Sequence, residues 1–325
     1  MNTHNTLLGL SLFALLLGFM AWSYYRSERR RPLRTRGWVG LGIISLAELC
    51  LVLHVKWPSI YFTPIAWTGY LLFVDGLVES LEGRSRLRQA PWDFIALAFW
   101  SVPLWLVFEA YNLRLANWKY VGLPDSRVLR DIGYAWSFAT IWPAIYETAD
   151  FLRALGLGMG TRRRVVLGPL AHSGLFALGL VLVGMPVLLP PHVGSYLFGA
   201  VWAGFVLLLD PISYRWGERS LLRDLEQGNT STLYPFLASG LACGVLWEFW
   251  NYWAAAKWLY VFPIWQNAKI FEMPLPGFLG FPSFALECFV MFEFLRTLRR
   301  HLIGFRPREP RAISQGDTET AELTP

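Results

Sequence analysis

Residues 247–253, Trp-Glu-Phe-Trp-Asn-Tyr-Trp, close an apolar run that begins at Leu233 and is long enough for a membrane-spanning helix. Positions three apart share one face of a helix, so Glu248 and Asn251 point to the same place, inside or at the edge of the hydrocarbon. A Trp-Leu-Tyr segment follows at residues 258–260. The pattern predicts a carboxyl group and an amide surrounded by indole rings.

The same arrangement occurs earlier in the chain, as Phe-Glu-Ala-Tyr-Asn at residues 108–112 followed by Trp-Lys-Tyr at 118–120. Asp-Phe-Leu-Arg at 150–153 recurs as Glu-Phe-Leu-Arg at 293–296. Four more residues recur at one constant offset, namely Tyr61, Trp67, Gly69 and Asp75 as Tyr196, Trp202, Gly204 and Asp210. These matches predict a tandem internal duplication.

Composition predicts an integral membrane protein. In 325 residues, 54% are hydrophobic and only 16% are charged, and the mean hydropathy is +0.37. Nine apolar runs are each near the roughly 20 residues that a bilayer requires. They are Leu7–Tyr25, Trp38–Val55, Ile60–Leu81, Pro91–Leu113, Gly133–Leu152, Val165–Leu189, Ser195–Tyr214, Thr232–Ala254 and Pro274–Leu295.

The predicted fold is therefore an all-α membrane protein with about nine transmembrane helices. Residues 1–37 form an N-terminal anchor with a basic loop, 38–153 the first four-helix repeat and 165–296 the second. Residues 306–325 are polar and form a disordered cytoplasmic tail. Because each repeat has an even number of spans, the two repeats are expected in parallel orientation.

The distribution of Lys and Arg predicts the orientation. Most of the 29 basic residues fall in segments on one side of the nine-span arrangement, which should be cytoplasmic. The N-terminus is then outside and the C-terminus inside, and a bacterial inner membrane is the expected location. This pattern explains the net charge of +6 without nucleic acid as a partner. Three cysteines at unrelated spacings indicate neither disulfides nor a thiolate metal site. The oligomeric state is not predicted.

Glu109, Glu248 and Glu287 are the predicted catalytic residues, because ionisable groups in membrane spans usually mark a functional site or a structural pair. A carboxylic acid kept neutral in an apolar pocket can protonate an alkene or an epoxide, and indole faces can stabilise the carbocation. The alternative is that Glu109 and Glu248 only hold the two repeats together. The predicted substrate-binding residues are Asn112, Asn251, Trp118, Tyr120, Trp247, Trp250, Trp258 and Tyr260.

Other candidates favour structural roles. Asp75 and Asp210 precede cytoplasmic loops and are expected in ion pairs or at helix ends, and His172 is expected to be a packed imidazole. Trp118, Tyr120, Trp258 and Tyr260 also suit an interfacial aromatic belt. The Pro- and Gly-rich segment 271–287 is the candidate cover of a pocket. The chain has no His-rich box, P-loop, GxGxxG or GxSxG motif, so neither a metal nor a cofactor is predicted.

The chain contains one pattern twice in tandem: an acidic residue in a span, then Trp-x-Tyr, then a Pro-containing loop that leads to a further acid. This pattern resembles the membrane lycopene-cyclase and carotenoid-hydratase type of protein. The cyclases have paired acids close after a proline, whereas here Pro282 precedes the single Glu287. The resemblance implies redox-neutral cyclisation, isomerisation or hydration of a carotenoid or other isoprenoid lipid, without a bound nucleotide. A proton-coupled transporter or lipid-binding membrane protein and a non-catalytic membrane scaffold are the alternatives.

Overall fold

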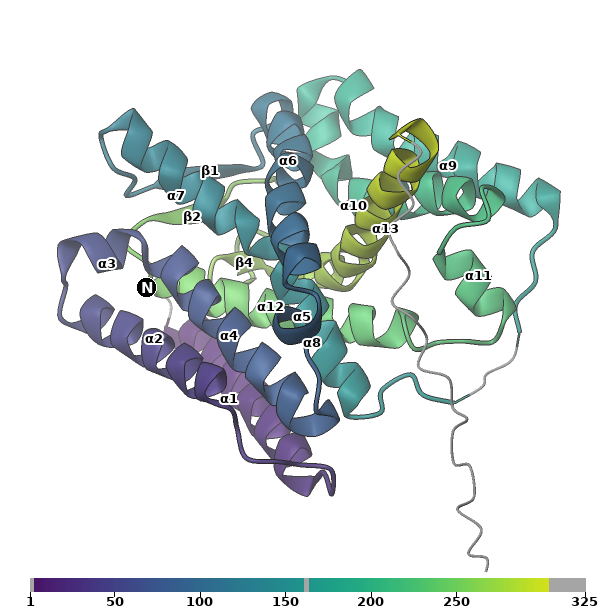
Figure 1. The fold of residues 1–325 in the computed structure, drawn as a ribbon. Coiled ribbons are helices and arrows are strands. Elements are labelled where there is room, and N and C mark those ends of the chain that lie inside the picture. The colour runs from purple at the N-terminus through teal and green to yellow at the C-terminus, as the bar shows by residue number, and fades with distance from the viewer. Residues whose placement is uncertain (1–2, 161–163, 304–325) are drawn as a thin grey trace, which may run out of the picture.

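The computed structural model describes residues 3–160 and 164–303, and this part of the chain is mostly α-helical (Figure 1). The predicted tail at 306–325 lies outside the described residues. The helices are α1 (Thr3–Arg26), α2 (Thr35–Val52), α3 (Lys56–Ile60), α4 (Phe62–Glu82), α5 (Arg86–Gln89), α6 (Pro91–Leu115), α7 (Arg127–Ala139), α8 (Ile141–Ala154), α9 (Pro169–Leu188), α10 (Pro191–Arg215), α11 (Leu221–Glu226), α12 (Leu233–Trp253) and α13 (Gly280–Ile303).

Six helical segments in the described residues are long and apolar enough to cross a membrane. They are Thr6–Arg26, Thr35–Val52, Pro91–Leu115, Pro169–Leu188, Pro191–Arg215 and Leu275–Leu302. Large apolar side chains on them face outward; Leu15, for example, is 68% exposed and Leu170 is 87% exposed. A soluble protein rarely exposes so many large apolar side chains. The chain therefore has the architecture expected of an all-α membrane protein.

Two further predicted spans, Ile60–Leu81 and Thr232–Ala254, correspond to the helices α4 and α12, which lie in the interior. α8 packs against both α4 and α12, and α12 also packs against α13. Helices from both predicted repeats thus share one hydrophobic core. The fully buried rings of Phe236 on α12 and Phe289 on α13 lie 5.1 Å apart within it.

The predicted span Gly133–Leu152 is not one continuous helix, and this prediction is wrong. The chain forms α7 and α8, which meet at Thr140. Pro143 provides the physical reason, because it has no N–H for the carbonyl of Ala139 and its ring would clash with that carbonyl in a continuous helix. With 14 residues, α8 extends over about 21 Å, which is shorter than the hydrocarbon core of a bilayer.

Close helix packing between α2 and α4 depends on a pair of glycines. A Cβ atom on Gly40 would lie 2.4 Å from the carbonyl oxygen of Gly69, and one on Gly69 would lie 2.8 Å from that of Gly40. Neither distance is possible for a real side chain, so both positions require glycine. Small residues of this kind allow membrane helices to approach through their backbones.

The two Trp-x-Tyr segments are part of short strands that pair with each other. β1 (Trp118–Val121) runs antiparallel to β2 (Lys257–Tyr260), and we call this pair the ribbon. A second pair, β3 (Lys269–Ile270) with β4 (Met273–Pro274), precedes a 3₁₀ turn at Leu275–Leu279. The ribbon joins segments that are far apart in sequence (Figure 1).

Candidate functional site

Asn112 fixes the first ribbon strand to the end of α6. Its side-chain nitrogen donates to the carbonyl oxygen of Trp118 at 2.9 Å, and its side-chain oxygen accepts from the Trp118 N–H at 3.0 Å. One helical turn earlier, Glu109 Oε1 accepts from Tyr120 at 2.6 Å, from Trp105 at 2.9 Å and from Trp118 at 3.2 Å. On the helix face predicted from the i, i+3 spacing, Asn112 therefore bonds the backbone of the first strand, and Glu109 accepts hydrogen bonds from three side chains.

Asn251 and Glu248 make an equivalent arrangement with the second strand. Asn251 donates to the carbonyl oxygen of Trp258 and accepts from its N–H, both at 2.9 Å. Tyr260 donates to Glu248 Oε1 at 2.9 Å and in turn accepts from the Trp258 indole at 2.8 Å. Glu248 is fully buried, and its Oε2 atom has no hydrogen-bond partner among the described residues. The second carboxyl thus has fewer donors than the first and a drier environment.

The ribbon register brings the two arrangements face to face. Trp118 pairs with Tyr260, and Tyr120 pairs with Trp258. Each Trp-x-Tyr segment is therefore opposite the other in reverse order, as expected around a local twofold axis between the strands. Two carboxyl–tyrosine pairs from distant parts of the chain consequently lie at one place in the fold.

Both tyrosines retain their protons over the physiological range. Burial first, and then the negative charge of Glu109, raise the pKa of Tyr120 well above its ordinary value of 10.0. Burial and Glu248 raise the pKa of Tyr260 in the same way. Each phenol therefore keeps its proton and can donate a hydrogen bond.

A cavity of about 420 Å³ lies against the ribbon and is walled mainly by aromatic rings. This volume is within the range of small-molecule sites in proteins. We call it the aromatic cavity. Its aromatic lining comprises Tyr61, Trp67, Trp105, Phe108, Trp118, Tyr120, Tyr134, Phe138, Tyr196, Phe198, Trp202, Trp247, Trp258, Tyr260, Phe262, Phe281 and Phe284.

Glu109 and Glu248 are not among the residues that line the aromatic cavity; the tyrosines bonded to them are. Trp118, Trp247 and Trp258, which the sequence suggests as substrate-binding residues, line it. Asn112, Asn251 and Trp250, also predicted to bind substrate, are not in the lining; the two asparagines bond the ribbon backbone. Trp250 donates to Glu48 at 3.0 Å and packs edge-on against Trp67 at 4.9 Å.

The segment 271–287, predicted as the cover of a pocket, does line the aromatic cavity through residues between Met273 and Phe284. Gly280, at the start of α13, is required for this packing. A Cβ atom there would lie 1.6 Å from a ring carbon of Trp202, so any side chain would displace this indole from the cavity wall. The repeated glycines and prolines of the segment indicated irregular backbone in advance.

Glu287 lies on α13 one turn beyond Ser283 and is not in the cavity lining. It is fully buried, and neither carboxyl oxygen has a hydrogen-bond partner in the described chain. Glu147 on α8 has the same two properties. Buried carboxyl groups without partners are costly, so both are candidates for proton handling, outside the aromatic cavity.

α7 supplies a cavity wall that sequence reasoning missed. Tyr134 and Phe138, one turn apart on this helix, stack at 5.6 Å, and Tyr134 contacts Tyr120 of the ribbon at 5.0 Å. Hydropathy alone did not indicate this wall, because it assigned the residues after Gly133 to one membrane span. The amphipathic periodicity of residues 127–139 was the available signal.

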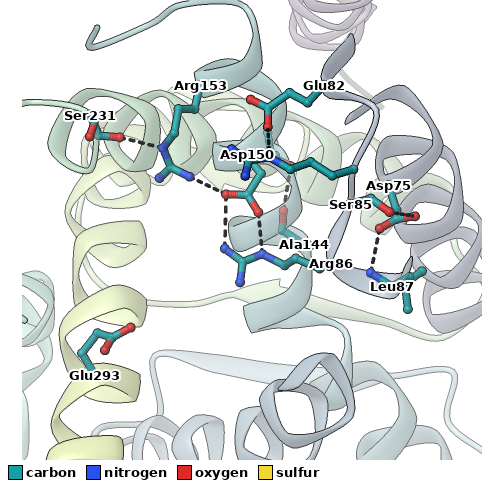
Figure 2. Close-up of polar contacts among 12 residues, drawn as sticks. Asp75, Glu82, Ser85, Arg86, Leu87, Ala144, Asp150, Arg153, Ser231 and Glu293 are labelled. Carbon is teal, nitrogen blue, oxygen red and sulfur yellow. Dashed lines mark hydrogen bonds and ion pairs between the residues drawn. The ribbon is translucent and has the colours of Figure 1, made fainter. Parts of the chain in front are cut away.

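Asp75 and Asp210 hold the starts of two short helices at the end of the bundle away from the ribbon. Asp75 accepts from the Leu87 N–H at 3.0 Å and from the Ser85 hydroxyl at 3.0 Å (Figure 2). Asp210 accepts from the N–H groups of Leu221 and Leu222 at 2.8 and 2.9 Å. The predicted helix-end role of both aspartates is confirmed.

Asp150 is the centre of an ion cluster at the same end (Figure 2). Arg86 reaches both of its oxygens, at 2.5 and 3.2 Å, and Arg153 adds a contact at 2.5 Å while donating to the Ser231 carbonyl oxygen at 3.0 Å. His172 packs against the Tyr214 ring at 4.5 Å, as expected for a structural imidazole. These contacts stabilise the bundle and lie outside the aromatic cavity.

The phenols of the site suit proton transfer, and its aromatic walls suit an apolar ligand. Among the described residues, no group of three or more His, Cys, Asp or Glu side chains could hold a metal ion. Comparison of the chain with family models, with curated proteins and with solved structures finds no match. The resemblance to lycopene cyclases and carotenoid hydratases therefore stays a prediction.

Proposed function

We propose that the protein is a multi-pass membrane enzyme that carries out acid-initiated, redox-neutral chemistry on an isoprenoid lipid, such as cyclisation, isomerisation or hydration of a carotenoid. One observation carries this proposal: two carboxyl–tyrosine pairs present their phenols to a single aromatic cavity. Apolar walls favour a hydrocarbon ligand, and the phenols supply polar groups at the cavity surface.

Glu248 is the proposed acid, acting through Tyr260. In the structure, Tyr260 donates to Glu248 across the 2.9 Å contact. When the carboxyl group is neutral, this hydrogen bond reverses, and Glu248 gives its proton to the phenol oxygen while the phenol proton passes to an alkene carbon. A C–H bond forms, the alkene π bond breaks, and Glu248 is left as a carboxylate. Loss of a proton from a neighbouring carbon returns the proton to this carboxylate, so the net reaction is redox-neutral. Surrounding indoles such as Trp247 and Trp258 stabilise the carbocation through their π faces.

The proposed membrane arrangement has nine crossings, an N-terminal helix followed by two parallel four-helix repeats, with the fifth crossing broken between α7 and α8. Equivalent bonds in the two halves support the duplication: Asn112 matches Asn251, and Asp75 matches Asp210. Basic segments support an N-terminus outside and a C-terminus in the cytoplasm, in a bacterial inner membrane.

Lipid analysis of a host that expresses the full chain and contains carotenoid and polyprenyl precursors tests the proposal. Glu248→Gln and Tyr260→Phe should abolish a new isoprenoid product detected by mass spectrometry, and Glu109→Gln and Tyr120→Phe report on the first copy. Glu226→Gln is the matched control. Glu226 accepts a 2.8 Å hydrogen bond from the Tyr214 hydroxyl, and neither residue lines the aromatic cavity. An unchanged lipid profile on expression of the parent would refute the enzyme.

A second candidate is a proton-coupled transporter or lipid-binding protein. The fully buried, unpartnered carboxyls of Glu147 and Glu287, both outside the aromatic cavity, favour it. Proton uptake into vesicles containing the purified chain, measured with and without an added isoprenoid, distinguishes this candidate. Uptake that needs the lipid and is lost in Glu147→Gln or Glu287→Gln would support transport, and the absence of uptake would exclude the transporter.

A further inference from the structure

Two opposite faces of α7 have different surroundings. Val128, Ile132 and Trp136, spaced four residues apart, are 67%, 53% and 39% exposed and form an apolar stripe. Arg130 and Tyr134 lie on the other face and line the aromatic cavity. As the first half of the proposed fifth crossing, the amphipathic α7 turns this stripe toward lipid, and Arg130, near the start of the helix, lies at the level of the headgroups.

Arg130 is one of two ionisable cations in the cavity lining, and their surroundings differ. Lys257 is neutralised by Glu272 at 2.8 Å and also donates to the carbonyl oxygen of Tyr252. Arg130 has no carboxylate partner among the described residues, since the nearby Asp131 pairs with Arg127 at 3.6 Å. The described lining contains no Asp or Glu, although the Glu109 carboxylate lies directly behind Tyr120 and Trp118. Arg130, a half-buried residue, is therefore the one cation of this lining without a direct carboxylate partner.

We propose that the ligand of the aromatic cavity is an amphipathic lipid with an anionic phosphate or carboxylate headgroup, bound by Arg130, whose apolar chain lies against the aromatic walls. A guanidinium binds such oxyanions through two parallel hydrogen bonds, and these charge-assisted bonds are the strong ones. The proposal deepens the function above by naming the substrate class, and it rests on that function only for the identity of the cavity as the substrate site.

The alternative to a specific headgroup site is that Arg130 is an interfacial arginine, which extends into water and contacts lipid headgroups without selectivity. Arg127 provides the internal comparison. It lies on the same helix three residues earlier, its side chain is 86% exposed, and it does not line the cavity. A general attraction of α7 to anionic membranes would involve both arginines, whereas a headgroup site in the cavity involves Arg130 alone.

Binding to the purified full-length chain in neutral detergent tests the proposal, with tryptophan fluorescence as the signal. The probes are geranylgeranyl phosphate, geranylgeraniol and inorganic phosphate. We expect the phosphorylated lipid to bind about tenfold or more tightly than the alcohol, and inorganic phosphate neither to bind measurably nor to compete. Arg130→Gln should remove this preference without changing the affinity for the alcohol, while Arg127→Gln should keep it.

Equal affinity for phosphate and alcohol, or equal losses in Arg130→Gln and Arg127→Gln, would overturn the proposal. Competition by inorganic phosphate at the same concentrations would assign the site to free anions. The two proposals fail separately: Arg130-dependent binding without any lipid product refutes the enzyme alone. A product that needs Glu248 but forms equally well in Arg130→Gln refutes the headgroup site alone.

Discussion

Replacing Asn251 by alanine removes both hydrogen bonds that attach β2 to α12. Asn251 is fully buried, and its bonds to the N–H and carbonyl oxygen of Trp258 are both 2.9 Å long. Each net bond contributes about 1 kcal/mol, and a buried backbone group left without a partner costs about 1–3 kcal/mol. The substitution should lower the free energy of unfolding by about 2–4 kcal/mol, which raises the fraction of opened molecules by about 30- to 1,000-fold.

The chain contains its own reporters for this measurement. Cys243 and Cys288 are fully buried, whereas Cys50 is partly exposed. In a Cys50→Ser background, the labelling rate of the two buried thiols by a maleimide in detergent follows the opened population, provided that reclosing is faster than labelling. We expect Asn251→Ala to increase this rate by the factor above.

Asn112→Ala is the matched comparison, because Asn112 makes the same two bonds but is only partly buried. Its effect should be smaller, since the Asn112 residue is already partly exposed and its truncation removes less buried contact than that of Asn251. A labelling rate within threefold of the parent in Asn251→Ala would refute the reasoning, because it would mean that the amide bonds contribute nothing to the core that holds the cysteines.

Two other substitutions have expected outcomes. Gly280→Ala places a methyl group 1.6 Å from Trp202, so the indole must move. We expect about 1–3 kcal/mol of destabilisation in the same thiol assay, together with weaker lipid binding. A variant with the stability and lipid affinity of the parent would contradict this packing. Asp210→Asn keeps one acceptor oxygen for the two N–H groups at the start of α11, so the free energy of unfolding should fall by about 1–2 kcal/mol. Asp224→Asn is the control and should change stability less, because one carboxylate oxygen of Asp224 has no hydrogen-bond partner among the described residues.

Hydropathy and repeated motifs predicted much of this fold from the sequence. The apolar runs located the helices, and the i, i+3 spacing correctly placed Glu248 and Asn251 on one face. The break at Thr140 was missed because a 20-residue hydropathy average ignores a single Pro143 that ends one helix and begins another. The ribbon was missed because two four-residue strands, each too short to be recognised alone, are defined only by pairing with one another.

The candidate site was predicted in part for a similar reason. Trp-x-Tyr after a buried glutamate indicated that indoles and phenols gather near a carboxyl group, and Tyr260 does bond Glu248. Spacing along a helix cannot show which group faces an empty volume, so the sequence placed the carboxyl groups in the pocket where the structure places the phenols. Trp250 shows the same limit: its indole bonds Glu48, a residue distant in the sequence.

Strand pairing between residues 118–121 and 257–260 also determines when the site can exist during biosynthesis. Synthesis delivers β1 long before β2, so the first strand must wait, with its edge unpaired, while α7 to α12 are made. Non-local pairing of this kind forms late and leaves an exposed edge in the meantime. The aromatic cavity is thus completed only after the second Trp-x-Tyr segment and the later lining residues, up to Phe284, have been translated.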